Sequence, residues 1–183
     1  ELKIRERDRA QQERVWFGEH SGMLQGKRLG VMGTGSIGRH IAETARAFSM
    51  NVSGLSRSGA AQPEFDDVFA ADRLQDFLRG VDYLVSTLPQ TEATDNLLDA
   101  AALKCLPAHA YFINVGRSNV VDDDALVEAL ETGRLAGAAL DVFDEEPLPQ
   151  DSALWSAPNL SVTAHIAAIS HPELIVTIFV ENY

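Results

Sequence analysis

The stretch KRLGVMGTGSIGRHIAETARAF, residues 27–48, decides the fold. Its first six residues are typical of a short buried strand, and residues 36–48 have the spacing of an amphipathic helix. Between them, GTGSIG matches the pattern G-x-G-x-x-G, which indicates a dinucleotide-binding turn when a strand precedes it and a helix follows it. A glycine-rich turn without a ligand is the alternative, and this context makes it the weaker one. The helix is expected to bury one face, made of Ile37, Ile41, Ala45 and Phe48.

Each glycine of this motif has a separate physical task. Gly33 permits the tight turn, Gly35 lets the backbone approach a pyrophosphate, and Gly38 allows the helix to pack closely on the strand. Unpaired amide groups at the start of the helix, those of Ser36 and Ile37 among them, bind the phosphates together with the helix dipole. The motif therefore predicts a dinucleotide cofactor.

The rest of the chain alternates strand-like and helix-like segments. Gly80 and Gly133 are expected to end helices, and Cys105, the only cysteine, is expected in the core. This alternation predicts an α/β fold, a Rossmann-type doubly wound parallel sheet with helices on both faces. Further strands are expected near residues 51–56, 81–88, 110–115, 135–143 and 159–164, and helices near residues 1–15, 71–80, 96–105 and 122–133.

The segment VSGLSRSG, residues 52–59, lies where a dinucleotide fold usually offers a carboxylate to the ribose hydroxyls of NAD. No Asp or Glu occurs between residues 44 and 63. Ser56, Arg57 and Ser58 stand there instead, and a guanidinium with two hydroxyl groups suits a 2′-phosphate. The segment predicts a preference for NADP over NAD. The alternative is an ordinary polar turn in which Arg57 points to water.

Composition narrows the class of protein. The 183 residues are 45% hydrophobic and suit one globular domain. Twenty-seven acidic residues against 15 basic ones give a formal net charge of −12, which disfavours nucleic acid as a partner. No apolar run reaches the roughly 18 residues of a membrane span. A single cysteine cannot form an intramolecular disulfide, which suits a cytoplasmic location. No metal site is predicted.

Three further segments carry residues suited to catalysis. Arg117, in FINVGRSNVV, follows an apolar strand and is expected at the edge of the sheet where α/β folds bind ligands. Asp141 and Glu146, in LDVFDEEPLP, follow a second strand, and His165, in VTAHIAAIS, follows the last one. Taken singly, these residues suit a surface ion pair, a loop cap, a solvated turn and a structural histidine. Their order along the chain favours one common site.

In this order, with Glu146 29 positions after Arg117, the motifs resemble those of the D-isomer-specific 2-hydroxyacid dehydrogenases. The resemblance runs from about Leu24 to the end of the chain, and the SRS, LPQTEAT and HIAAIS segments look most like the glyoxylate/hydroxypyruvate reductase branch. It implies hydride transfer between NAD(P)H and a small 2-keto acid or D-2-hydroxy acid. Arg117 then binds the substrate carboxylate, His165 supplies the proton, and Glu146 orients the histidine ring.

The resemblance also implies cofactor contacts. Asp141 contacts the nicotinamide carboxamide. Leu88 and Pro89 border the adenosine, with Thr94 nearby. The residues expected along the nicotinamide are Val115, Gly116, Ala167 and Ala168.

Some residues depart from the family pattern. Gly116 replaces a common Ala, Ser118 replaces a Gly, and Ala164 replaces a Pro. None of them removes a reacting group. Trp155 is expected to pack in the loop before the last strand, with a place beside the substrate as the alternative.

The resemblance implies an organisation into three parts. Residues 1–23 form a connecting helix and loop from a substrate domain, residues 24–170 form the NAD(P)-binding domain, and residues 171–183 form a helix leading back. It also implies a homodimer through the cofactor domain. We expect the 183-residue chain by itself to bind cofactor and to turn over poorly. Two alternatives stay open: an NAD(P)H-sensing binding protein of the same fold, and a related Rossmann enzyme acting on an amino acid.

Overall fold

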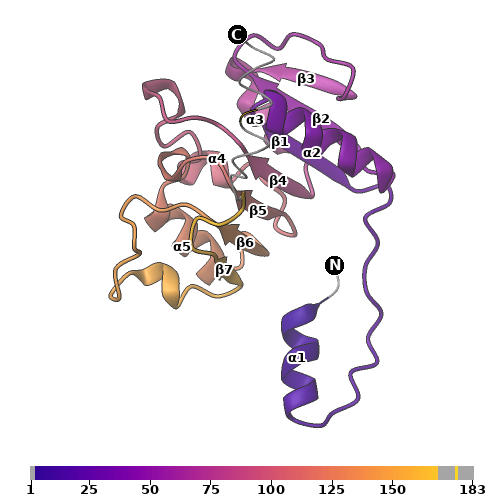
Figure 1. Ribbon diagram of the computed structural model, residues 1–183, viewed down its shortest axis with the longest axis vertical. Helices are drawn as coiled ribbons and strands as arrows, with labels where there is room; N and C mark the ends of the chain where they lie inside the picture. The colour runs from indigo at the N-terminus through magenta and orange to yellow at the C-terminus, as the bar shows by residue number, and fades with distance from the viewer. Residues whose placement is uncertain (1–2, 169–175, 177–183) are drawn as a thin grey trace.

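The computed structural model describes residues 3–168 and residue 176, and it contains one seven-stranded sheet in which every neighbouring pair of strands is parallel (Figure 1). The strand order is β3-β2-β1-β4-β5-β6-β7. Strands β2 and β3 are therefore added on one side of β1, and strands β4 to β7 are then added on its other side. This confirms the doubly wound fold. The strands are β1 Arg28–Met32, β2 Asn51–Ser56, β3 Asp67–Ala70, β4 Tyr83–Ser86, β5 Tyr111–Asn114, β6 Gly137–Leu140 and β7 Leu160–Val162.

Helices cover both faces of the sheet, and an apolar cluster is buried on each face. Leu29 and Val31 of β1 pack with the α2 face, whereas Met32 belongs to the larger cluster on the opposite face with Phe77 and Leu126. A parallel sheet buried on both faces requires this. The helices are α1 Ile4–Gln12, α2 Ser36–Ala47, α3 Leu74–Leu78, α4 Ala100–Leu103 and α5 Asp123–Glu131, with short 3₁₀ turns η1 Ala71–Arg73, η2 Glu92–Thr94, η3 Ser118–Val120 and η4 Ala153–Trp155.

The buried face of α2 differs from the expected one. Its buried residues are Gly38, Ala42 and Ala45, whereas Ile37 is 61% exposed and Phe48 is 57% exposed. The prediction of Ile37 and Phe48 as core residues is therefore wrong. Small residues are buried because they let the helix approach the sheet closely, as at Gly38, where a Cβ would lie 3.2 Å from Val31 Cγ1. Ile37 lies in the first turn and Phe48 is the residue that caps the end of the helix.

Strand β3 was not predicted from the sequence. It begins with a charged residue, Asp67, and its other residues are only half-buried. An edge strand carries a weaker hydrophobic pattern than a central one, because only one side pairs and less of its surface is buried. Central strands such as β1 and β2, which are mostly apolar or small, lie where the sequence predicts them.

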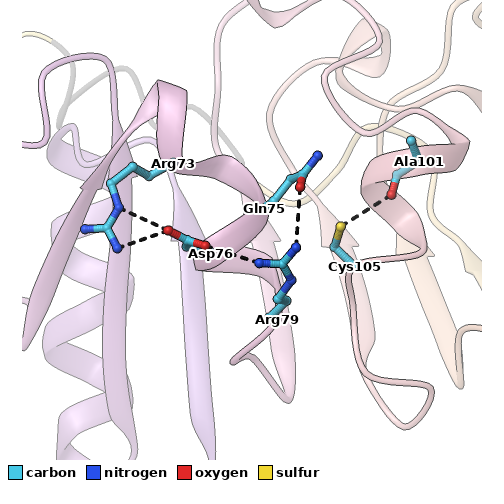
Figure 2. Close-up of polar contacts among 6 residues, drawn as sticks. All are labelled: Arg73, Gln75, Asp76, Arg79, Ala101 and Cys105. Carbon is cyan, nitrogen blue, oxygen red and sulfur yellow. Dashed lines mark hydrogen bonds and ion pairs between the residues drawn. The ribbon is translucent and has the colours of Figure 1, made fainter.

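The predictions for two helix ends and for the cysteine are confirmed to different degrees. Gly133 has φ +67 and its N–H bonds to Leu130 O, so its role as a helix stop is confirmed. Helix α3 ends before Gly80, which does not have a positive φ. Cys105 is half-buried and packs against the core, and Figure 2 shows its Sγ against the carbonyl of Ala101 at 3.5 Å. The expectation of a core cysteine is thus met in part.

Helix α1 lies outside these layers, at the end of an extended segment formed by residues 13–25 (Figure 1). No helix among the described residues has the length and apolar content that crossing a membrane requires. The expected helix at residues 171–183 and the last two residues of the HIAAIS motif lie outside the described residues.

Candidate active site

The predicted site residues follow the carboxyl ends of six strands of one sheet. The central pair of strands, β1 and β4, is where the direction of chain winding reverses, and open α/β folds bind ligands at that position. A hydrogen bond across this crevice, from Thr87 Oγ1 to Gly33 O at 3.0 Å, joins the ends of the two strands. The residues in sheet order are Ser56 after β2, Gly33 after β1, Leu88 after β4, Arg117 after β5, Asp141 after β6 and His165 after β7.

The glycine loop has the shape that a pyrophosphate requires. Gly33 has φ +98, a conformation that favours glycine. Gly35 precedes α2, and a Cβ built there would meet nothing within 4 Å, so this side of the loop is open. A Cβ on Gly38 would lie 1.9 Å from Gly33 O, so only glycine fits there. The loop and the first turn of α2 therefore fit a dinucleotide in both space and hydrogen-bonding capacity.

The turn after β2 holds two serines that fold the backbone. Ser56 Oγ accepts from Gly59 N at 3.0 Å, and Ser58 Oγ accepts from Ala60 N at 3.3 Å. Because each hydroxyl accepts, its own proton stays available for a ligand. Arg57 is exposed, and its guanidinium makes no hydrogen bond or ion pair with any residue that the structure describes. Two hydroxyl donors and a guanidinium thus gather at one turn without a carboxylate.

Arg117 is positioned by a residue that sequence reasoning missed. Asn114, fully buried at the end of β5, accepts from Gly116 N at 3.1 Å and donates to Arg117 O at 2.9 Å. Both bonds shape the backbone that presents the exposed guanidinium, which itself donates to Gly116 O at 2.8 Å. A polar residue ending the apolar strand YFIN was the available signal.

His165 and Glu146 form the predicted pair. His165 Nδ1 lies 2.9 Å from Glu146 Oε2, and Glu146 Oε1 accepts from Phe143 N at 3.0 Å. The hydrogen bond to His165 and the one from Phe143 lower the pKa of Glu146. A carboxylate at Nδ1 makes Nε2 the nitrogen that can exchange a proton with a substrate.

Asp141 holds the loop that carries His165. Its Oδ1 accepts from Thr163 Oγ1 at 2.5 Å and from Ile166 N at 3.0 Å, and its Oδ2 accepts from Ala167 N at 2.9 Å. His165 has φ +54, which non-glycine residues rarely adopt, so these anchors on either side keep a strained backbone in place. Burial opposes ionisation of Asp141, but these hydrogen bonds and nearby His165 outweigh it and lower its pKa. These contacts are the ones expected of a residue that caps a loop, which is the alternative role that the sequence suggested for Asp141.

An Asp141→Asn substitution is expected to destabilise the protein by about 1–3 kcal/mol at pH 7, because the new amide presents a donor where the carboxylate accepted. The lowered pKa of Asp141 means that its contribution is present above the ordinary value of 3.8 and is lost as pH falls through the folded-state pKa. Urea denaturation should therefore show that the variant and the wild type differ less in their free energy of unfolding below about pH 4 than at pH 7. Asp151→Asn, at an exposed aspartate, is the matched control and should change little. An equal loss at pH 7 and pH 3 would contradict the assignment.

One cavity of about 580 Å³ brings Arg117, Glu146 and His165 together. A second cavity, of about 440 Å³ and mostly apolar, shares Phe143, Glu146 and His165 with it and is lined in part by Trp155. Trp155 is 55% exposed and its indole N–H donates to Pro149 O, so it packs within the loop before β7 and also borders this second cavity.

The wall of the larger cavity is acidic at one end. Asp144 lines it, and Asp123 lies close enough to Asp144 to interact. Burial, with Asp144, Asp122 and Asp124, raises the pKa of Asp123 to about 6. The negative charge on this side therefore increases as the pH rises through about 6.

The departures from the family pattern have partial explanations. A Cβ on Gly116 would lie 2.7 Å from Leu88 O, so glycine lets this segment approach the end of β4 closely. Ser118 does not have a positive φ, so no glycine is required there. Nothing in the structure explains Ala164.

The remaining predicted cofactor residues lie along the same edge. Thr94 Oγ1 lies 2.8 Å from Pro89 O and accepts from Thr91 N, so its hydroxyl shapes the loop after β4. Leu88 and Val115 are half-buried, whereas Ala167 and Ala168 are exposed beside His165.

Comparisons with known proteins agree with this geometry. The family model described as D-isomer specific 2-hydroxyacid dehydrogenase, NAD binding domain, matches residues 2–167. Glyoxylate/hydroxypyruvate reductase A of Klebsiella pneumoniae (strain 342) is 35% identical over 154 residues, which are 84% of this chain and 49% of that protein. The chain thus spans about half the length of the relatives it matches.

Solved structures are similar along the whole described fold. A D-isomer specific 2-hydroxyacid dehydrogenase family protein from Aeromonas salmonicida subsp. salmonicida A449 has a TM-score of 0.93 at 42% identity, covering 100% of this chain and 59% of that one. The NADPH-dependent glyoxylate/hydroxypyruvate reductase from Sinorhizobium meliloti, in complex with NADP and sulfate, has a TM-score of 0.87 at 31% identity, covering 98% and 58%. With its glycine loop, its Rossmann-type sheet and a family model matching residues 2–167, the chain belongs to the D-isomer specific 2-hydroxyacid dehydrogenase family, as an NAD-binding domain.

Proposed function

We propose that this chain is the cofactor-binding part of a longer reductase, which transfers hydride between NADPH and a small 2-keto acid such as glyoxylate or hydroxypyruvate. The observation that carries the proposal is the single cavity lined by Arg117 and by the hydrogen-bonded pair of His165 and Glu146. A carboxylate-binding cation and a proton donor in one cavity, next to a dinucleotide loop, suit reduction of a carbonyl beside a carboxylate.

The chain's residues divide the chemistry between binding and proton transfer. When bound, the nicotinamide cofactor supplies the hydride in reduction and takes it up in oxidation. Arg117 binds the substrate carboxylate through two N–H groups. His165 gives a proton to the carbonyl oxygen from Nε2, or takes one in the reverse direction. Glu146, with its lowered pKa, stays ionised near neutrality and stabilises the imidazolium.

We propose NADP as the preferred cofactor and NAD as the weaker one. The turn of Ser56, Arg57 and Ser58 offers donors to a 2′-phosphate and no carboxylate that would repel it. The similar reductase from Sinorhizobium meliloti is NADPH-dependent and was crystallised with NADP, which supports the same choice here.

Arg57→Ala is expected to weaken NADPH binding by about ten- to a hundredfold and to leave NADH binding nearly unchanged. A charge-assisted hydrogen bond contributes about 1.5–3 kcal/mol, and NADH has no group that needs it. Titration of tryptophan or nicotinamide fluorescence with each cofactor measures both constants. Arg79→Ala, at an exposed arginine on α3, is the control. Equal losses for the two cofactors would count against a 2′-phosphate pocket.

An assay of the longer protein separates the three functions considered. A reductase consumes NADPH when glyoxylate or hydroxypyruvate is added. A redox-sensing protein binds NADPH and leaves both keto acids unchanged. An enzyme acting on an amino acid turns over only when an amine donor accompanies the keto acid. Consumption of NADPH with the keto acid alone is the expected result.

The remaining expectations concern the whole protein. We propose that residues 1–23 connect to a substrate domain, that residues 24–170 bind the cofactor, and that residues 171–183 lead back. We also propose a homodimer through the cofactor domain. The segment that leads into this domain supports it, because Trp16 is 95% exposed and Met23 is 70% exposed within the extended residues 13–25 (Figure 1). Large apolar side chains at such exposure favour burial against a second copy. A cytoplasmic location is proposed from the single cysteine.

A further inference from the structure

The loop that carries Arg57 and Ser58 continues past them and contacts the glycine loop. Residues 57–64 leave the end of β2 and return to the buried Phe65. Within them, Gln62 Nε2 donates to Thr34 Oγ1 at 2.7 Å. Thr34 is the residue between the first two glycines of GTGSIG, and it is only 9% exposed. One short side-chain hydrogen bond thus joins the 57–64 loop to the loop proposed to bind the pyrophosphate.

The other anchors of the 57–64 loop hold its two ends. At its start, Gly59 N bonds to Ser56 Oγ, and Ser58 forms a bridge with Ala70 of β3. At its far end, Arg46 of α2 donates to Pro63 O at 2.9 Å. The start of the turn, at Ser56, is already held near the glycine loop by the backbone bond from Gly33 N to Leu55 O at 2.9 Å. The bond from Gln62 adds a tie from within residues 57–64 and so holds the part of the turn that carries Arg57 and Ser58.

We propose that Gln62 is a positioning residue for NADP selectivity. It holds the 57–64 loop, and with it Arg57 and Ser58, at a fixed distance from the glycine loop, so that one dinucleotide reaches both. The proposal rests on the proposed 2′-phosphate pocket. A cofactor with a 2′-phosphate has anionic groups on both loops and depends on their separation. NADH has anionic groups only on the glycine loop, so it does not.

The contacts also suggest how to break the link without unfolding the protein. Gln62 Oε1 is buried with no partner among the described residues, so Gln62→Leu removes an unsatisfied acceptor together with the donor. Thr34→Val keeps the methyl group that packs over Gly54 and removes only the hydroxyl. The two substitutions delete the same bond from its two sides.

The test is titration of wild type, Gln62→Leu, Thr34→Val and the double variant with NADPH and with NADH. Loss of one hydrogen bond is expected to lower the NADH-to-NADPH ratio of Kd about fivefold in each single variant. The double variant should lower it no further, because both changes remove one interaction. Adenosine 2′,5′-bisphosphate and 5′-AMP should repeat the difference, since they carry the phosphate contrast without nicotinamide.

Control variants distinguish the proposed role of Gln62 from the proposed 2′-phosphate pocket on which it rests. Gln75→Leu and Thr44→Val make the same chemical changes on α3 and α2, away from the 57–64 loop, and should leave the ratio unchanged; Figure 2 shows Gln75 paired with Arg79. If Arg57→Ala lowers NADPH affinity while Gln62→Leu and Thr34→Val leave the ratio at its wild-type value, positioning by Gln62 is refuted and the pocket stands. If Arg57→Ala also has no effect, the pocket itself is refuted and the role of Gln62 with it. Equal weakening of both cofactors by Gln62→Leu reveals a merely structural residue and overturns the proposal.

Discussion

Replacing His165 with alanine is expected to lower kcat for keto-acid reduction about 10²–10⁴-fold in the longer protein that carries this chain. The ring is the proton donor in the proposed reaction, and alanine offers no substitute near the carbonyl oxygen. Binding of NADPH is expected to survive, because the glycine loop proposed to hold the phosphates follows β1, whereas His165 follows β7 at one edge of the sheet. We therefore expect the substitution to lower kcat and to change the Kd for NADPH little.

The chain supplies its own control for this experiment. His109 Nε2 lies 2.7 Å from Asp82 Oδ1, so the described residues contain a second exposed histidine hydrogen-bonded to a carboxylate. Asp82 lies directly before β4 and His109 shortly before β5, at the opposite edge of the sheet from His165. His109→Ala should keep kcat near wild type, as measured by the decrease in NADPH absorbance with glyoxylate. Near-normal turnover by His165→Ala would remove this histidine from the mechanism.

The central part of the fold could be predicted because local signals and burial agree there. The strand, glycine loop and helix at residues 27–48 are adjacent in sequence, and each indicates the next. The helix stop at Gly133 could also be predicted, because a positive φ favours glycine. Strand β3 could not, since an edge strand that starts with Asp67 and stays half-buried lacks the apolar pattern of a central strand.

The face of α2 shows a limit of periodicity. Periodicity favours large apolar residues, so it selected Ile37 and Phe48. The structure buries Ala45, as predicted, but the other buried residues of the helix are Gly38 and Ala42, because close packing against parallel strands excludes large side chains. Which face of a helix is buried depends on the distance to the sheet, and that distance is not a property of the helix sequence alone.

The sequence brought Arg117, Asp141, Glu146 and His165 into one predicted site through ordered motifs, but it did not predict most of the contacts that hold this edge of the sheet together. Several of these contacts are long-range: Asp141 bonds to Ile166 and Ala167 across 25 and 26 positions, and Gln62 bonds to Thr34 in the glycine loop across 28. Asparagine, glutamine and threonine at those positions are ordinary polar residues in the sequence. Only the fold shows which backbone groups they face.

Gly38→Ala is expected to abolish binding of both NADPH and NADH and to destabilise the protein by about 1–3 kcal/mol. The new Cβ would lie 1.9 Å from Gly33 O and 3.1 Å from Gly33 C, so backbone atoms must move. Gly33 N is bonded to Leu55 O at 2.9 Å, and Gly33 itself has φ +98. Relief of the clash therefore either lifts α2 from the sheet or distorts the turn that presents the phosphate-binding amides.

Gly35→Ala distinguishes a folding role from a binding role within the same loop. A Cβ at Gly35 would meet nothing within 4 Å, and its φ of −74 is ordinary for alanine. Urea denaturation should therefore find Gly35→Ala as stable as wild type, while titration finds both cofactors strongly weakened, because the methyl group occupies the space of the pyrophosphate. Gly38→Ala should lose stability and binding together. If Gly35→Ala bound NADPH as wild type does, the pyrophosphate would have to lie elsewhere, and the assignment of GTGSIG as its site would fail although the fold remained intact.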